Sequence, residues 1–318
     1  PVLFVSLPWT TSLLTLAVVM FLYALVANTI RPLAESMVPD FLPPQRRSRA
    51  NAVVKIATSL TIVVASLVSL LVVDEHPRGA FGIPAAILLG VTVVLIVKVR
   101  DNQSAGYRAA VAGGEERVPF RRVLTDLLTD PDRRRVLLLL TVFLFGGAWF
   151  ASRSLITPYG MAALGLTRGE AGGLTLPSGI AFLLAAYPAA LLADRYGRLR
   201  VIGVGMALFT AAMVAGTFVQ TATGTVVVFC IAAAGAAGFS INAAVALWNL
   251  APSSRVLGAY TGLYAVTWYL GGFAGPALIG LAVDLTGWDG MLLDIAVLSA
   301  LAVLVIARLG RLQRRSGT

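Results

Sequence analysis

The sequence predicts an all-α polytopic membrane protein, because of its composition and the length of its apolar runs. Hydrophobic residues make up 58% of the 318 residues, charged residues make up 13%, and the mean hydropathy is +0.85. Several apolar runs reach the roughly 20 residues with which an α-helix crosses the hydrocarbon core of a bilayer. This composition excludes a soluble globular domain.

Nine runs are long and apolar enough to be predicted as membrane spans, and short polar turns separate most of them. They are residues 10–37, 51–73, 79–97, 136–158, 172–192, 201–219, 225–248, 257–283 and 290–307. The sequence has one cysteine, Cys230, and one histidine, His76, so it offers no thiol or imidazole cluster for a metal ion. We therefore expect no metal, no cofactor and no enzymatic activity.

The lysines and arginines orient the spans. Of the 25 in the chain, twenty fall in one set of alternating segments and two in the other, while three lie within spans. The basic set comprises residues 39–50, 98–135, 194–200, 249–256 and 308–318. Because cytoplasmic loops carry the excess of Lys and Arg, these segments and the C-terminus are predicted to be cytoplasmic. The net charge of +10 then faces anionic lipid of the plasma or inner membrane, and nucleic acid is not an expected partner.

One long connection, residues 98–135, separates three spans from six. Its second part has apolar residues at helical spacing, which predicts an amphipathic helix on the cytoplasmic membrane surface: Phe120, Val123, Leu124, Leu127 and Leu128. After it, Asp130 is predicted as the N-cap of the next span, with Asp132 in its first turn. The predicted parts are therefore residues 1–97, the linker 98–135, the six-span part 136–308 and a basic tail, 309–318.

The turn between the spans 172–192 and 201–219 is short and charged. Gly197 is expected to allow the backbone to reverse there, and three arginines follow one another closely: Arg195, Arg198 and Arg200. Asp194 ends the preceding span and has no comparable explanation as a turn residue.

Three stretches resemble the major facilitator superfamily. Residues 190–198, ALLADRYGR, are similar to the family signature G-x-x-x-D-R-x-G-R-R/K, except that Ala190 replaces the first glycine and Leu199 the last basic residue. Residues 271–280, GGFAGPALIG, followed by DLTGW at 284–288, resemble the family's penultimate span and outer loop. Residues 28–32 and 38–52 look like the end of a fourth span and the loop after it.

The sequence of residues 38–52, together with RVLGAYTGLY at 255–264, most resembles sucrose-type and glycoside–pentoside–hexuronide proton symporters. Drug–proton antiporters of the superfamily usually carry a G-x-x-x-G-P-x-x-G-G pattern in the fifth span. The corresponding run here, residues 51–73, has neither glycine nor proline. Since such transporters have two six-span halves, the resemblance implies that the first three of twelve spans are missing.

Polar residues within the spans are costly to insert and are therefore candidates for function. Arg31 and Glu35 are four residues apart and can pair, either as a gate or coupling element or as an interfacial ion pair with a snorkelling arginine. Glu35 is the one clear candidate for a proton-binding acid. The full set of coupling or substrate candidates is Arg31, Glu35, Asn28, Arg153, Trp149, Asn242, Trp268 and Tyr264. For the aromatic residues, helix packing is the alternative to stacking on a sugar ring.

The resemblance implies a secondary active transporter that moves a small polar solute by alternating access, with sugar–proton symport as the first expectation. An efflux antiporter and a non-transporting membrane sensor or assembly protein are the alternatives. The predicted gating residues are Asp194, Arg195, Gly197, Arg198 and Asn51. By pseudo-symmetry, Asp194 is expected beside the helix that begins at Asn51, where its carboxylate would interact with the helix dipole. The expected partners are the solute, protons and the bilayer, and the expected state is a monomer.

Overall fold

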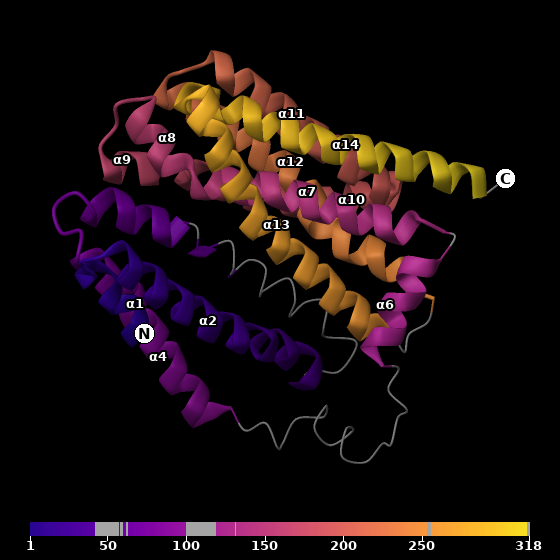
Figure 1. Cartoon of the computed structure of the whole chain (residues 1–318), viewed down its shortest axis with the longest axis horizontal. Coiled ribbons are helices and arrows are strands. Elements are labelled where there is room, and N and C mark those ends of the chain that lie inside the picture. Colours follow the sequence, from indigo (N-terminus) through magenta and orange to yellow (C-terminus); the bar gives the residue numbers. More distant parts are fainter. Residues whose placement is uncertain are drawn as a thin grey trace. The chain divides into compact units, whose positions relative to one another are not determined.

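The computed structural model describes residues 1–41, 57, 60, 61, 63–99, 119–130, 132–252 and 256–316. The side chains of residues 28–41, 257 and 314–316 lie outside the described part. Throughout the described ranges the regular elements are helices, and none is a strand. The chain divides into two compact units, Pro1–Glu116 and Arg117–Thr318, and each is considered by itself below (Figure 1).

The first unit contains α1 (Val2–Ser6), the 3-10 helix η1 (Leu7–Trp9), α2 (Leu13–Phe41) and α4 (Gly79–Lys98). Residues 63–72 are also helical. The ring of Phe4 in α1 lies 5.3 Å from that of Tyr23 in α2 and 5.4 Å from that of Phe81 in α4, measured between centroids. These aromatic contacts join the three helices of this unit.

The second unit consists of long helices that run side by side, with short helices at their ends (Figure 1). They are α6 (Phe120–Thr129), α7 (Arg134–Ser154), α8 (Ile156–Ala162), α9 (Arg168–Gly173), α10 (Leu176–Tyr196), α11 (Arg198–Phe218), α12 (Ala222–Asn249), α13 (Leu257–Thr286), η4 (Trp288–Gly290) and α14 (Met291–Ser316). Helices α13 and α14 pack along α7, and α12 packs on α10 and α11. Helix α14 also lies against α11, so that the six long helices form one bundle.

Seven helices of the described residues are long and apolar enough to cross a membrane, as the all-α polytopic prediction requires. They are α4, α7, α10 together with α9, α11, α12, α13, and α14 with η4. Two shorter apolar helices, residues 13–27 and 63–72, fall within the predicted spans 10–37 and 51–73, whose full lengths stay predictions. The predicted span 136–158 differs from the structure, because α7 ends at Ser154 and α8 begins at Ile156.

Glycines set the distance between two pairs of long helices. A Cβ atom on Gly275 of α13 would overlap the backbone of Gly147 in α7, and one on Gly271 would overlap the carbonyl oxygen of Phe143. In the same way, a Cβ on either Gly205 of α11 or Gly235 of α12 would overlap the carbonyl oxygen of the other. In a membrane, where lipid is as apolar as leucine, close backbone packing of this kind is a main source of helix association.

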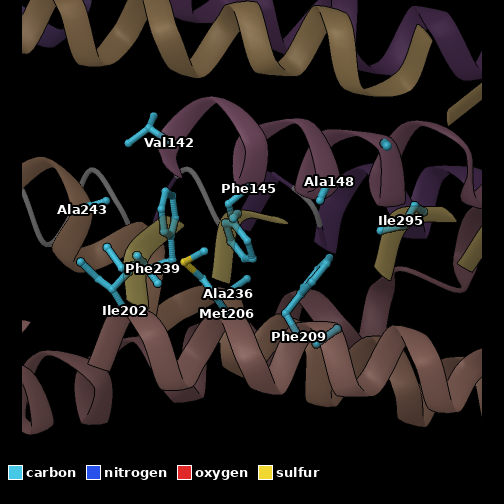
Figure 2. Packing of buried hydrophobic residues seen from close by; sticks show 14 of the residues in the cluster. Val142, Phe145, Ala148, Ile202, Met206, Phe209, Ala236, Phe239, Ala243 and Ile295 are labelled. Carbon is cyan, nitrogen blue, oxygen red and sulfur yellow. The ribbon is translucent and has the colours of Figure 1, made fainter. Parts of the chain in front are cut away.

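Aromatic rings and one polar pair form further contacts between the long helices. Phe145 of α7 lies between Phe209 of α11 and Phe239 of α12, with centroid distances of 5.1 and 4.6 Å (Figure 2). In the α11–α14 contact, the hydroxyls of Thr210 and Ser299 are 2.8 Å apart. Since Ser299 is fully buried, this hydrogen bond satisfies a hydroxyl that has no access to solvent.

Helix α6 occupies the stretch for which an amphipathic helix is predicted, but its apolar residues divide between two surroundings. Val123 and Leu127 are buried and belong to the core of the bundle, whereas Phe120 and Leu128 are exposed. Part of the apolar face therefore packs on protein, a contact that the membrane-surface prediction did not include. The location of the exposed part at a membrane surface stays a prediction.

Candidate functional site

The guanidinium of Arg153 lies in the last turn of α7, a helix of membrane length. Its carbon atom Cζ is 4.3 Å from the ring centroid of Trp149, one turn earlier on the same helix. A cation above an indole ring gains about 0.5–2 kcal/mol, with the larger value where water is excluded. Trp149 therefore fixes the position of this side chain.

A second helix holds the other side of the guanidinium. Arg153 Nη1 donates a hydrogen bond of 2.7 Å to the hydroxyl of Ser178 in α10, which itself donates to the carbonyl of Thr175. The Nε atom of Arg153 is covered from solvent and has no hydrogen-bond partner among the described residues. The ion pairs within the described part of the chain do not include Arg153.

A guanidinium without a carboxylate partner is unusual inside a membrane-length helix, because its desolvation is not offset by an opposite charge. Its fork of N–H donors suits a carboxylate or a pair of adjacent hydroxyl oxygens. Cys230 of α12, the one cysteine in the sequence, is half-buried and lies within electrostatic reach of it. Arg153, Trp149 and Ser178 thus form a polar group at the end of α7, in which the Nε donor of the guanidinium has no partner among the described residues.

The aromatic candidates of α13 contact other rings of the protein. The ring of Trp268 is stacked on that of Phe239 at 5.8 Å and on that of Tyr264 at 6.4 Å, with interplanar angles of 19° and 6°. Phe150 of α7 meets Trp268 edge-on at 5.2 Å. These contacts favour a packing role for Trp268 and Tyr264, the alternative that the sequence left open.

Asn242 is also engaged within the bundle. It is buried in α12, and its Nδ2 donates a 2.9 Å hydrogen bond to the carbonyl of Gly238, one turn earlier on the same helix. One of the two N–H donors of the Asn242 amide is therefore used by the helix backbone in this structure.

The charged turn has the backbone that its sequence predicts. Gly197 has φ = +91°, which residues with a Cβ rarely adopt, and its N–H closes α10 by donating to the carbonyl of Ala193. Asp194 pairs with Arg198 at 3.4 Å, and the Asp194 side chain is 72% exposed. Arg195 lies over the ring of Tyr196 at 5.3 Å. An exposed ion pair of this kind contributes about 0–1 kcal/mol. The pair with Arg198 is therefore too weak to compete firmly with the contact predicted between Asp194 and the helix that begins at Asn51.

The remaining candidates belong to the first unit. The backbone of Asn28, Arg31 and Glu35 lies in α2, but their side chains lie outside the described part of the structure. Asn51 lies outside the described residues altogether. The pairing of Arg31 with Glu35 and the contact between Asp194 and the helix beginning at Asn51 therefore stay predictions.

Sequence reasoning missed a hydrogen-bonded group at the other end of α7. Arg135 Nη1 donates a 2.8 Å hydrogen bond to the hydroxyl of Tyr260 in α13, and its Nη2 pairs with the carboxylate of Asp130. Residues 135 and 260 are 125 positions apart, so nothing local in the sequence indicates this contact. It links α7 to α13 and, through Asp130, holds the segment that precedes α7.

The start of α7 also differs from its prediction. Asp130 is not the N-cap, because the helix begins at Arg134 and both acids precede it. Asp132 instead accepts hydrogen bonds from the backbone N–H and from Nε of Arg134. The hydrogen bond from this side chain holds the pKa of the Asp132 carboxyl below its ordinary value.

Replacing Tyr260 by phenylalanine is expected to lower the thermal stability of the protein in detergent. The change removes the acceptor of a hydrogen bond from a charged group, and such bonds contribute about 1.5–3 kcal/mol. Tyr187→Phe is the matched control, since Tyr187 is 73% exposed on α10. Equal melting temperatures for the two variants would show that the Arg135–Tyr260 contact does not stabilise the bundle.

Comparison with known proteins adds the family to this geometry. The model of the Major Facilitator Superfamily matches residues 2–181 and, in a second match, residues 138–317. Among solved structures, a crystal structure of the Escherichia coli fucose:proton symporter resembles the chain with a TM-score of 0.52 at 16% sequence identity. The similarity covers 74% of this chain and 55% of the symporter, so the chain spans about half of that protein's length. No curated protein matches the chain in sequence.

Proposed function

Because the chain belongs to the major facilitator superfamily, we propose that it is a secondary active transporter that moves a small polar solute across the membrane by alternating access. The single observation that supports this most directly is the family match, which extends over nearly the whole chain. The seven membrane-length helices agree with a multi-pass protein of this kind.

Sugar–proton symport is the finer proposal. It is supported by the likeness of residues 28–32, 38–52 and 255–264 to sucrose-type and glycoside–pentoside–hexuronide proton symporters, and by a fold shared with a fucose:proton symporter. Arg153 would bind solute oxygens through its guanidinium donors, while Trp149 and Ser178 position it. Glu35 is the proposed proton-binding acid, since the other carboxylate within a predicted span, Asp294, lies close to the end of its span, in the first turn of α14.

Uptake into proteoliposomes tests this proposal. The full chain would be reconstituted with an acidic exterior, and the uptake of radiolabelled fucose, sucrose and maltose would be followed with and without a protonophore. We expect one of these sugars to accumulate, and the protonophore to abolish the accumulation. Extrusion of a lipophilic cation, with no uptake of any sugar, would identify an efflux antiporter and contradict sugar symport.

A further inference from the structure

A cavity of about 950 Å³ opens at the ends of α10, α11, α12 and α14, next to the charged turn. Four arginines line it, Arg134, Arg198, Arg200 and Arg311, and no Asp or Glu is among its lining residues. This volume is in the range of small-molecule sites in proteins, about 300–1,000 Å³. The cavity therefore combines room for a ligand with a charge of a single sign.

Two of these arginines have no carboxylate partner within the described part of the chain. Arg134 is paired with Asp132 at 2.6 Å, and Arg198 with Asp194 at 3.4 Å. Arg200 and Arg311 are exposed, and the ion pairs of the described residues do not include either one. Helix α11 begins at Arg198 without a side-chain cap, so the positive end of its dipole adds to the field at this point.

An exposed apolar surface adjoins the arginines on the side of the helix bodies. Val204 lines the cavity and is 69% exposed, and Leu208, one turn further along α11, is 42% exposed. On α14, Leu304 is 65% exposed and lies one turn before Ala307, which lines the cavity. A ligand whose anionic end is bound at the arginines would thus extend along this apolar surface. The surroundings suit a ligand with one charged end and one hydrocarbon end.

We propose that this cavity binds the phosphodiester headgroup of an anionic phospholipid, with an acyl chain along Val204, Leu208 and Leu304. The charge is complementary, because a phosphodiester accepts the hydrogen bonds that Arg200 and Arg311 leave unused. The charge distribution of the sequence predicts that this turn is cytoplasmic, and the cytoplasmic leaflet holds the anionic lipids. Basic pockets between transmembrane helices on that side are a known type of lipid site.

The test uses the full chain purified in a neutral detergent and titrated with short-chain lipids, with binding followed by native mass spectrometry. The probes are dihexanoyl phosphatidylglycerol, dihexanoyl phosphatidylcholine and inorganic phosphate. We expect saturable binding of phosphatidylglycerol, with phosphatidylcholine and inorganic phosphate at least about tenfold weaker. Binding of inorganic phosphate as tight as that of the lipid would overturn the proposal, because the occupant would then be a soluble anion.

Two double variants locate the site. Arg200→Gln with Arg311→Gln should weaken phosphatidylglycerol binding about 25-fold, since each arginine near an anionic lipid is expected to contribute about fivefold. Arg121→Gln with Arg122→Gln removes the same charge from exposed positions of α6 outside the cavity, and should leave binding unchanged. An equal loss in both variants would show that net charge alone attracts the lipid, and would overturn the proposed site. The single variants Arg200→Gln and Arg311→Gln give the same comparison if the double variant does not fold.

Discussion

Replacing Gly275 by alanine is expected to disrupt the contact between α7 and α13. A Cβ at this position would overlap the Gly147 backbone, and backbone atoms cannot move aside as a flexible side chain can. The helices would have to separate along a contact to which Gly147 and Gly271 also belong. Overpacking of this kind usually costs about 1–3 kcal/mol, and we expect a value at or above the upper end. The melting temperature in detergent measures the effect.

Gly280→Ala is the control for this substitution, on the same helix. A Cβ on Gly280 would meet no atom within 4 Å, and alanine is favoured over glycine in a helix by about 0.8–1 kcal/mol. We therefore expect the two variants to change stability in opposite directions. If Gly275→Ala proves as stable as Gly280→Ala, the glycine contact does not set the spacing of α7 and α13.

Replacing Arg153 by methionine is expected to reduce solute transport at least about tenfold without lowering thermal stability. The change removes donors whose hydrogen bonds to a solute contribute about 1.5–3 kcal/mol. Stability should hold or rise, because burying the guanidinium carries a desolvation cost that no ion pair among the described residues offsets. Ser178 keeps its hydrogen bond to the carbonyl of Thr175 in the variant, so no hydroxyl is left unpaired. The measurements are the initial rate of uptake in proteoliposomes and the melting temperature in detergent.

Arg168→Met is the matched control, since Arg168 is exposed at the start of α9. It should change neither quantity. Unaltered transport in Arg153→Met would show that Arg153 does not bind the solute and only extends its charge toward the membrane–water interface. Loss of transport together with a lower melting temperature would assign Arg153 to the folding of the bundle and not to the solute.

The long helices could be predicted because a membrane imposes their length and their apolar character. Their ends were less predictable. The break at Leu155 interrupts an apolar run. Pro158 lies in the first turn of α8, but a proline alone does not mark a break in this protein, because Pro84, Pro188 and Pro276 lie inside the continuous helices α4, α10 and α13. The start of α7 was misplaced because Asp130 and Asp132 bind arginine side chains there, and do not cap the helix as their positions suggest.

The candidate site was predictable only as far as it is local. Trp149 and Arg153 are one turn apart, so their contact follows from helical spacing. Ser178 comes from another helix, and no pattern in the sequence pairs it with Arg153. The glycines at 271–280 could be recognised in the sequence because they resemble a family motif. Their contact with Gly147 could not be predicted, since it depends on how α7 packs on α13. Contacts between distant helices depend on the whole bundle.

The measurement that tests the central proposal most directly is solute-driven proton movement. Proteoliposomes containing the full chain and a pH-sensitive dye in the lumen would receive sugar outside, with no pH gradient imposed. A proton symporter should acidify the lumen when its sugar is added, and Arg153→Met should suppress the signal. If no sugar moves protons while the same vesicles retain folded protein, the proposal of proton-coupled sugar transport is wrong.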